Sequence, residues 1–536
     1  MDVAFDGLKI DVSGKADGDV SGDGPAQESK AAVTVQGDHD AAIELDGDNE
    51  LKSGAGHAGL EHNKTDTSGE LTIQDKDNNG SLEAAGGFKG AGIGSAGSND
   101  AQVKITGGNI TATTSDDWGA GIGSGSYGTG TVEITGGEIN ATGGYLGAGI
   151  GGGCNGSGNV TISGGTITAA GSDGAAGIGG GYYNGATVTI TGDAVIKNAS
   201  STKYGAGIGG GNGSDGNVTI SGNAKIENAT GGYGAAGIGG GAFSSPDKIG
   251  NGNVVIKDNA KIDNVQGGAY GAGIGGGIYG LSNVTIEGNT KVNATGGAGG
   301  AAIGGGAGAE NNSDNNGNQI TIKSNENGSP TINAVGGGTD EGEKIVIGGA
   351  GIGAGCESDA DADITLEGKV TITATAGKDN VAIGANGIEQ EFSGLAEGSS
   401  ITRYDSEGND ITLPTDPVPA VPSSSGGGSA DASVQESVFP GLVVTDKDGQ
   451  RISYTSIRDN NVLSLRVGRF TASLRASLAT LRQLRAEGID TITFQTILCS
   501  TTLSVNELLA MGGEDAEVVL THHIRSSTLT VGGKAV

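Results

Sequence analysis

The feature that most constrains the fold is a short motif, Gly-Ile-Gly or a close variant, that recurs ten times along the chain. Most intervals between its central residues are 28 to 31 residues, and these residues are Ile93, Ile122, Ile150, Ile178, Ile208, Ile238, Ile274, Ile303, Ile352 and Ile383. A period of this length is the signature of structural units that stack on one another. We therefore expect a repeat array rather than a conventional globule.

Each unit contains the motif, often as GAGIGGG, then an alternating segment such as VTISG and a second one such as TITAA. Val160 and Ile162 should point inward and Thr161 outward, because successive side chains of a strand face opposite sides. Glycine runs and β-branched residues disfavour helical repeats. The pattern predicts an all-β fold, a right-handed parallel β-helix with three short strands per coil, whose glycines allow positive φ and tight corners.

Changes in composition divide the chain into four predicted parts. Residues 1–89 carry degenerate strands and should form atypical N-terminal coils that cap the core, and residues 90–412 hold the regular repeats. Residues 413–437 are rich in Pro, then Ser and Gly, and read as a linker. Residues 438–536 are predicted to form a small α+β module, with helices near 470–486 and from Val505. Because strand-like sequence reaches both ends, we expect a truncated piece of a longer protein.

The formal charge of −32 lies almost entirely outside the last hundred residues. Residues 436–536 contain ten basic and ten acidic residues, which leaves 20 basic against 52 acidic residues before them. Such a field repels phosphate backbones and anionic lipid head groups. We therefore expect no nucleic-acid partner and, in the absence of a long apolar run, no membrane insertion. Cations, neutral glycans and basic proteins remain as partners of a monomeric solenoid.

The three cysteines, Cys154, Cys356 and Cys499, are too few for a disulfide framework. Stacked coils would hold the first two about 29 Å apart at ~4.8 Å per strand spacing. All three are expected to be free thiols, with Cys499 buried. His522 and His523 would face opposite sides of one strand, which does not suit a shared metal.

Aromatic side chains follow the repeat. They stand four or five residues before or after the motif isoleucine, and they are Phe88, Trp118, Tyr127, Tyr145, Tyr182, Tyr183, Tyr204, Tyr233, Phe243, Tyr270 and Tyr279. Stacking should arrange them in two columns that flank a glycine-rich strand. Flat apolar ring faces beside Asn, Ser, Thr and Asp are typical of sugar-binding surfaces. The alternative is that the rings only pack on one another.

One segment, Asp75-Lys76-Asp77-Asn78-Asn79-Gly80, resembles the start of a calcium loop. Asp75, Asp77 and Asn79 supply oxygen ligands at the first, third and fifth positions, and Gly80 is the sixth. The twelfth position is Gly86, which supplies no carboxylate. Calcium is therefore an optional ligand, and an Asx-rich turn is the alternative interpretation.

Two further functions remain open. Asp116, Asp117 and Asp173 precede the motif and could serve glycoside hydrolysis, which needs two carboxylates about 5 to 10 Å apart. No arginine occurs before Arg403, so a usual proton-abstracting base of β-helical lyases is missing from residues 90–402. A column of outward threonines that includes Thr161, Thr189 and Thr219 also suits an ice-binding surface, although strand propensity explains it equally. A passive spacer is the remaining possibility.

The succession GAGIGGG and NVTISGGTITA resembles the glycine-rich repeats of surface proteins from Gram-positive gut bacteria, which are described as β-helical carbohydrate-binding domain proteins. The stretch LKSGAGHAGLEHNKTDTSGELTIQDKDNNGSLEAAGG looks like the lead-in segment of that group, so the resemblance covers residues 1 to about 390. It implies a secreted or wall-associated, adhesive protein and supplies no catalytic residues. The segment Leu413-Pro414-Thr415-Asp416 departs from a complete wall-sorting motif.

The combined expectation is a non-catalytic, extracellular β-helix that binds carbohydrate through the aromatic residues beside the Gly-Ile-Gly strands. A polysaccharide lyase or glycoside hydrolase is the rival. It predicts loss of activity when one acidic cluster is changed, whereas the binding hypothesis predicts graded loss over Trp118, Tyr145 and Tyr204.

Overall fold

The protein is described by a computed structural model that covers residues 2–13, 29–114, 118–242, 245, 248–310, 317–339, 347–417, 442–445, 451–452, 454–459, 461–467, 471–496, 499–511, 513, 516–523 and 526–535. Two compact units are present. The first comprises residues 1–407 and 411–420, and the second comprises residues 408–410 and 421–536.

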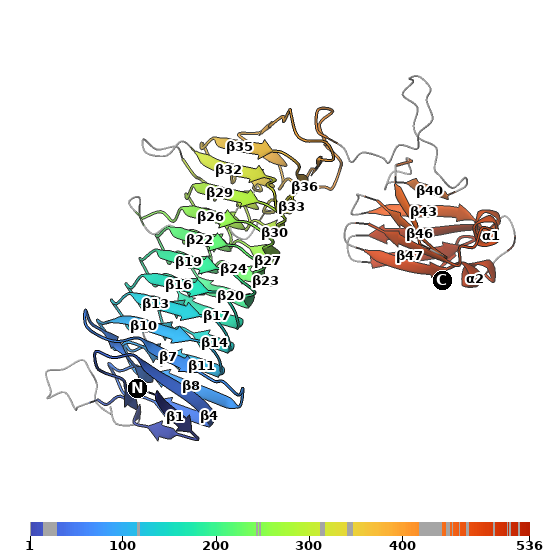
Figure 1. The fold of residues 1–536 in the computed structure, drawn as a ribbon. Helices are drawn as coiled ribbons and strands as arrows, with labels where there is room; N and C mark the ends of the chain where they lie inside the picture. The colour runs from blue at the N-terminus through green and yellow to red at the C-terminus, as the bar shows by residue number, and fades with distance from the viewer. Residues whose placement is uncertain are drawn as a thin grey trace. The chain divides into compact units, whose positions relative to one another are not determined.

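The first unit is a stack of coils in which equivalent strands of successive coils pair in parallel (Figure 1). One face, sheet A, contains the strands β1 (Asp2–Asp6), the start of β4 (Ala41–Lys52), β7 (Leu71–Gln74), β10 (Asp100–Ile105), β13 (Gly130–Ile134), β16 (Gly158–Ile162), β19 (Ala186–Ile190), β22 (Gly216–Ile220), β26 (Gly252–Ile256), β29 (Ser282–Glu287), β32 (Asn318–Lys323) and β35 (Ala362–Glu367). The short β6 (Asn63–Lys64) joins β10 in antiparallel fashion.

The second face, sheet B, is built in the same way from the next strand of each coil. It contains β2 (Lys9–Asp11), the end of β4, β8 (Gly80–Gly86), β11 (Asn109–Thr114), β14 (Glu138–Thr142), β17 (Thr166–Asp173), β20 (Val195–Lys203), β23 (Lys225–Ile226), β24 (Ala229–Thr230), β27 (Lys261–Gln266), β30 (Lys291–Thr295), β33 (Thr331–Val335), β36 (Thr371–Thr375) and β39 (Ser400–Tyr404). Val160, Ile162 and Ile167 are at most 2% exposed, which confirms the predicted inward ladders.

The recurring motif forms the third face, sheet C, and each motif contributes only two or three residues to it. The strands are β3 (Val33–Thr34), β5 (Leu60–Glu61), β9 (Ile93–Gly94), β12 (Ile122–Gly123), β15 (Ile150–Gly151), β18 (Ile178–Gly179), β21 (Ile208–Gly209), β25 (Ile238–Gly239), β28 (Ile274–Gly275), β31 (Ile303–Gly304), β34 (Ile352–Gly353), β37 (Ile383–Ala385) and the antiparallel β38 (Ile388–Glu389). All ten motif isoleucines predicted from the sequence are fully buried and lie in register.

The glycine after each isoleucine has a structural reason. Gly151 has a φ of +132°, a conformation that residues with a side chain rarely adopt. A Cβ atom on Gly151 would lie 2.0 Å from the carbonyl oxygen of Gly179 in the next coil. The backbone N–H of Ala148 donates to the carbonyl of Gly152 at 2.9 Å. This hydrogen bond closes a tight turn that places the side chain of Ile150 in the core.

The stack of coils continues on the N-terminal side of the first Gly-Ile-Gly motif, with other residues in the position of the motif. Val33 and Leu60 take the place of the motif isoleucine, and Leu60 pairs with Ile93 in register. Glu61 replaces the following glycine, is 3% exposed and accepts a hydrogen bond from the backbone N–H of Ala58 at 3.3 Å. In the described residues of this region, strands without the Gly-Ile-Gly motif continue the stack.

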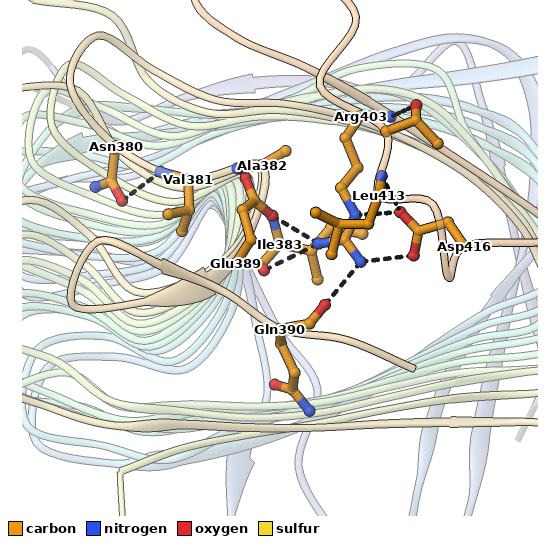
Figure 2. A network of polar contacts seen from close by, with 10 residues as sticks. Asn380, Val381, Ala382, Ile383, Glu389, Gln390, Arg403, Leu413 and Asp416 are labelled. Carbon is orange, nitrogen blue, oxygen red and sulfur yellow. Dashed lines mark hydrogen bonds and ion pairs between the residues drawn. The ribbon is translucent and has the colours of Figure 1, made fainter. Parts of the chain in front are cut away.

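The other end of the core is closed by a buried arginine (Figure 2). Arg403 follows the register of the inward alanines, pairing with Ala374, and is fully buried. Its Nε donates to Asp416 Oδ2 at 2.7 Å, its Nη2 to Asp416 Oδ1 at 2.9 Å, and its Nη1 to Glu389 Oε2 at 2.6 Å. Glu389 also accepts from the backbone N–H groups of Ala382 and Ile383. Sequence reasoning missed this cap.

The described residues of the second unit form two mainly antiparallel sheets and two helices. One sheet contains β40 (Leu442–Thr445), β43 (Ala472–Ser477), β46 (Glu517–His523), β47 (Ser526–Val531) and β48 (Lys534–Ala535), and the other contains β41 (Thr455–Asp459), β42 (Val462–Arg466), β44 (Thr491–Gln495) and β45 (Ser500–Ser504). The helices are α1 (Leu478–Ala486) and α2 (Val505–Leu509), each with a serine N-cap.

The predicted helix over 470–486 is wrong in its first half. Residues 472–477 form β43, which pairs with β40 and β46 and buries Ala472, Leu474 and Ala476 by strand alternation. The prediction gave more weight to the leucines that follow this segment than to the alternation of its apolar residues. Within the part of the chain that the structure describes, no helix is long and apolar enough to cross a membrane.

Candidate functional site

Each coil makes two tight turns, one before and one after its motif isoleucine, and the structure brings these turns together. The N–H of Cys154 donates to the carbonyl of Trp118 at 2.7 Å, that of Ala242 to Tyr204 at 2.8 Å, and that of Ala307 to Tyr270 at 2.8 Å. In each case the turn after one isoleucine bonds to the turn before the isoleucine of the preceding coil. The two predicted aromatic columns therefore lie side by side and form one surface.

We call this surface the tyrosine strip. Its members are Tyr127, Tyr145, Tyr182, Tyr183, Tyr204, Tyr233, Tyr270 and Tyr279. Five of them are clearly exposed, with fractions of 37% to 58%: Tyr127, Tyr145, Tyr204, Tyr233 and Tyr279. Tyr182, Tyr183 and Tyr270 are half-buried. A row of large exposed rings is unusual in a chain with so few aromatic residues.

Several tyrosines occupy a strained backbone conformation. Tyr127, Tyr183, Tyr204, Tyr270 and Tyr279 have φ between +57° and +71°, in the left-handed region. At the equivalent turn positions other coils carry glycine, for example Gly234 and Gly308. A residue with a Cβ costs roughly 1–2 kcal/mol there, so glycine would be the cheaper choice. Residues without a ring, such as Leu146, Asn155 and Glu357, adopt the same conformation in other coils, so the strain is a property of these turns and not of the rings.

Ring contacts run along the axis of the stack. The Tyr204 and Tyr233 centroids are 6.1 Å apart and those of Tyr233 and Tyr270 are 5.7 Å apart, both with edge-to-face geometry. The Tyr182 and Tyr183 centroids are 3.7 Å apart. The packing alternative is therefore realised in part, because the rings touch one another, yet they keep exposed faces.

Two tyrosines lie over glycines of the strip. A Cβ atom on Gly174 would lie 2.5 Å from Tyr182 Cδ2, and one on Gly308 would lie 2.6 Å from Tyr279 Cε1. These glycines leave room for the rings. Burial raises the pKa of Tyr182, and the neighbouring Tyr183 adds to this effect, so the phenol stays neutral. Phe243, another predicted binding residue, lies outside the described residues.

Phe88 and Trp118 lie at the same turn positions in earlier coils and form an aromatic pair nearer the N-terminus. Their ring centroids are 5.7 Å apart, and Lys89 Nζ lies 5.1 and 5.2 Å from the two rings. Both aromatic side chains are half-buried. A cavity of 430 Å³ lies beside Phe88 and is lined by residues of the first coils, including Lys52, Ser53 and Thr114.

Two lysines near the strip have partners. Lys203 Nζ lies 3.1 Å from Asp173 Oδ2, and Lys248 Nζ lies 4.5 Å from the Tyr183 ring centroid. Asp173, a candidate catalytic acid, is thus held in an ion pair. Asp116 and Asp117, the other two candidates, lie outside the described residues.

The candidate calcium loop gains a carboxylate from the preceding coil. Oxygens of Glu44, Asp75 and Asp77 lie within 4.8 Å of one another. Desolvation, followed by the charges of Asp46 and Asp75, raises the pKa of Asp77. The turn also satisfies itself, because Asp75 accepts from the N–H groups of Asn79 and Gly80 at 3.1 and 3.0 Å. Asn79 Nδ2 donates to Asp77 Oδ2 at 2.9 Å.

Glu44 was not among the predicted ligands. It comes from β4, and its backbone pairs with Gln74 beside the loop. Lys76 contacts the same side chain through its backbone N–H, at 2.6 Å, and through its ammonium group, at 3.4 Å. Only the register of stacked coils brings Glu44 to this loop, so local spacing could not reveal it.

The remaining predicted residues behave as ordinary structural groups. All three cysteines are free, as predicted; Cys154 and Cys356 are buried, whereas Cys499 is half-buried rather than buried. Cys499 lies near the end of the strand pair β44–β45, and its sulfur donates to the carbonyl of His523 at 3.4 Å. His522 is buried between Thr496 and Thr501, and His523 points outward, as strand alternation predicted.

A family model described as a beta helix repeat matches four segments, residues 103–126, 132–154, 160–182 and 218–242. Each segment starts in a strand of sheet A and ends in the turn after a motif isoleucine. The chain is a β-helix repeat protein. No curated protein and no solved structure matches it.

Three insertions in the sequence of this β-helix fall, in chain order, next to turns that flank a motif isoleucine. The insertions near residues 243–251 and 310–318 follow a motif and precede the first strand of the next coil. The insertion near residues 337–344 follows the second strand of a coil and precedes the motif of Ile352. Repeat proteins often concentrate insertions on their binding face. Lys248, from the first insertion, reaches the ring of Tyr183, so this insertion contacts the strip directly.

Proposed function

We propose that this β-helix is a non-catalytic carbohydrate-binding protein of the bacterial cell surface, secreted or wall-associated, and that it binds glycan through the tyrosine strip. The observation that carries the proposal is the row of tyrosines along the stack, five of which are 37% to 58% exposed and some of which contact one another from coil to coil. Rings presented in this way offer flat apolar faces for the C–H surfaces of sugars. The resemblance to glycine-rich surface proteins of Gram-positive gut bacteria supports an adhesive role.

The experiment compares retention of the full chain on a panel of polysaccharides: mixed-linkage β-glucan, xylan, galactomannan, mannan and peptidoglycan. The test variant carries Tyr204→Gly, Tyr270→Gly and Tyr279→Gly, which removes three rings and relieves backbone strain. Each lost ring contact is worth about 0.5–1.5 kcal/mol, so the affinity should fall roughly 10- to 1000-fold.

A matched control carries Asn155→Gly, Glu357→Gly and Asp379→Gly. These residues have the same positive φ at equivalent turns but present no ring. The control should bind as well as the natural chain. Equal loss in both variants would show that the turns, not the rings, matter, and no retention of the natural chain would favour a passive spacer.

The enzyme alternative is tested on the same panel by measuring new reducing ends and unsaturated products. The proposal expects neither. Product formation that disappears in an Asp173→Asn variant would overturn the non-catalytic assignment and favour a hydrolase or lyase.

Calcium is proposed only as an optional ligand of Asp75, Asp77 and Asn79, with Glu44 added by the structure. The panel is therefore run with calcium and with a chelator. Retention should not change, because these residues belong to the first coils and the strip begins at Tyr127. Calcium-dependent retention that Glu44→Gln abolishes would instead make the loop part of the glycan site.

A further inference from the structure

The tyrosine strip follows the stack of coils, with at least one tyrosine on each coil from Ile122 to Ile274. Coils stack at ~4.8 Å, and the contacts from Tyr204 through Tyr233 to Tyr270 join rings of successive coils. Tyr145 lies on an earlier coil and Tyr279 lies beyond Tyr270 on the same coil. A ligand that follows the axis meets ring after ring, whereas one that crosses it meets very few.

The strip is also open. The exposed tyrosines show between 37% and 58% of their surface, so part of each side chain is accessible to a ligand. The 430 Å³ cavity lies at the first coils, and none of the exposed tyrosines lines it. A site for the end of a sugar chain needs groups that enclose the terminal residue. Exposed rings along an axis instead suit a segment with chain continuing on both sides.

The charge of the molecule disfavours acidic polymers as ligands of the strip. Asp173 and Lys203 neutralise each other at 3.1 Å, and the ammonium group of Lys248 lies over the Tyr183 ring. The molecule as a whole carries −32, which repels acidic polymers at long range. A neutral polymer experiences no such repulsion.

We propose that the tyrosine strip binds internal segments of a neutral, linear polysaccharide that lies parallel to the axis of the β-helix, with one weak contact per ring. This inference rests on the proposed function and adds the orientation, the neutrality and the chain-internal mode. Affinity then grows with the number of rings covered, by roughly two- to tenfold for each added contact.

The test measures the affinity of the full chain for oligosaccharides, from disaccharide to decasaccharide, prepared by partial hydrolysis of a neutral polysaccharide that the panel retains. Affinity should rise with length and then level off. Borohydride reduction of the reducing end should leave the affinity of the longer oligosaccharides unchanged. In Tyr233→Ala, which removes a ring from the middle of the row, the rise should stop at a shorter length. Asn217→Ala, on the outer face of β22, is the control and should keep the full rise.

Three results would overturn the inference. Retained polysaccharide with equal affinity for disaccharide and decasaccharide would indicate one closed subsite and leave the proposed function standing. Loss of binding after borohydride reduction would indicate recognition of chain ends. A dimer in sedimentation that Tyr233→Ala dissociates would make the strip an interface between two copies. Absence of any retained polysaccharide would instead contradict the proposed function itself.

Discussion

At the residue scale, the same left-handed turn position is occupied by glycine in some coils and by a residue with a side chain in others. Gly213, Gly234 and Gly308 adopt it without strain, whereas Tyr204 and Tyr279 adopt it at a cost. Glycine after the motif isoleucine has no such alternative, because a Cβ atom there meets the next coil. The fold therefore requires glycine after the motif isoleucine, whereas at the turns it accepts either glycine or a larger residue.

This distinction predicts the effect of Gly151→Ala. The new methyl group would lie 2.0 Å from a backbone oxygen at a φ of +132°, so the variant should lose about 3 kcal/mol or more of local stability. Hydrogen exchange should accelerate in the coils around β15. Gly338→Ala, where nothing lies within 4 Å, is the control and should exchange like the natural protein. Unchanged exchange in Gly151→Ala would contradict the assigned stacking.

The thiols give a second prediction at this scale. Burial raises the pKa of Cys154 and that of Cys356 to about 11 each, so at pH 8 hardly any reactive thiolate forms at either site. Cys499 is partly exposed. A thiol-reactive dye at pH 8 should therefore label Cys499 first, and all three should react in denaturant. Rapid labelling of Cys154 in the folded protein would show that its coil opens readily.

At the element scale, the sequence was most informative where one pattern repeats. The motif isoleucines, their flanking strands and the column positions of Tyr204 and Tyr233 followed from periodicity alone. Contacts between residues of different coils did not, as with Glu44 beside Asp75 or Arg403 beside Glu389. The joining of two aromatic columns into one strip depends on hydrogen bonds between successive turns, which no single-coil pattern contains.

The cap at Arg403 carries the prediction at this scale. Arg403→Met leaves the carboxylates of Asp416 and Glu389 without their cation in a buried site, which should cost about 3–5 kcal/mol. The loss should appear as faster hydrogen exchange in β36 and β37. Arg475→Met removes an exposed partner of Glu517 and should cost less than about 1 kcal/mol. Similar small effects in both variants would show that Arg403 does not close the core.

At the scale of the whole molecule, stability and function depend on the same stacking. Each coil contacts mainly its neighbours, so the stability of the β-helix sums over adjacent pairs. The same stacking aligns weakly binding rings into a surface that a single coil cannot provide. The second unit has its own buried core, which includes Leu463, Leu481 and Phe494.

The central claim, that glycan covers the tyrosine strip, is tested most directly by hydroxyl-radical footprinting of the full chain with and without a retained polysaccharide. The account predicts protection of Tyr127, Tyr145, Tyr204, Tyr233 and Tyr279, with no change at the buried Tyr404 or at Tyr454 of the second unit. Bound polysaccharide with these five tyrosines still oxidised at their original rates would contradict it.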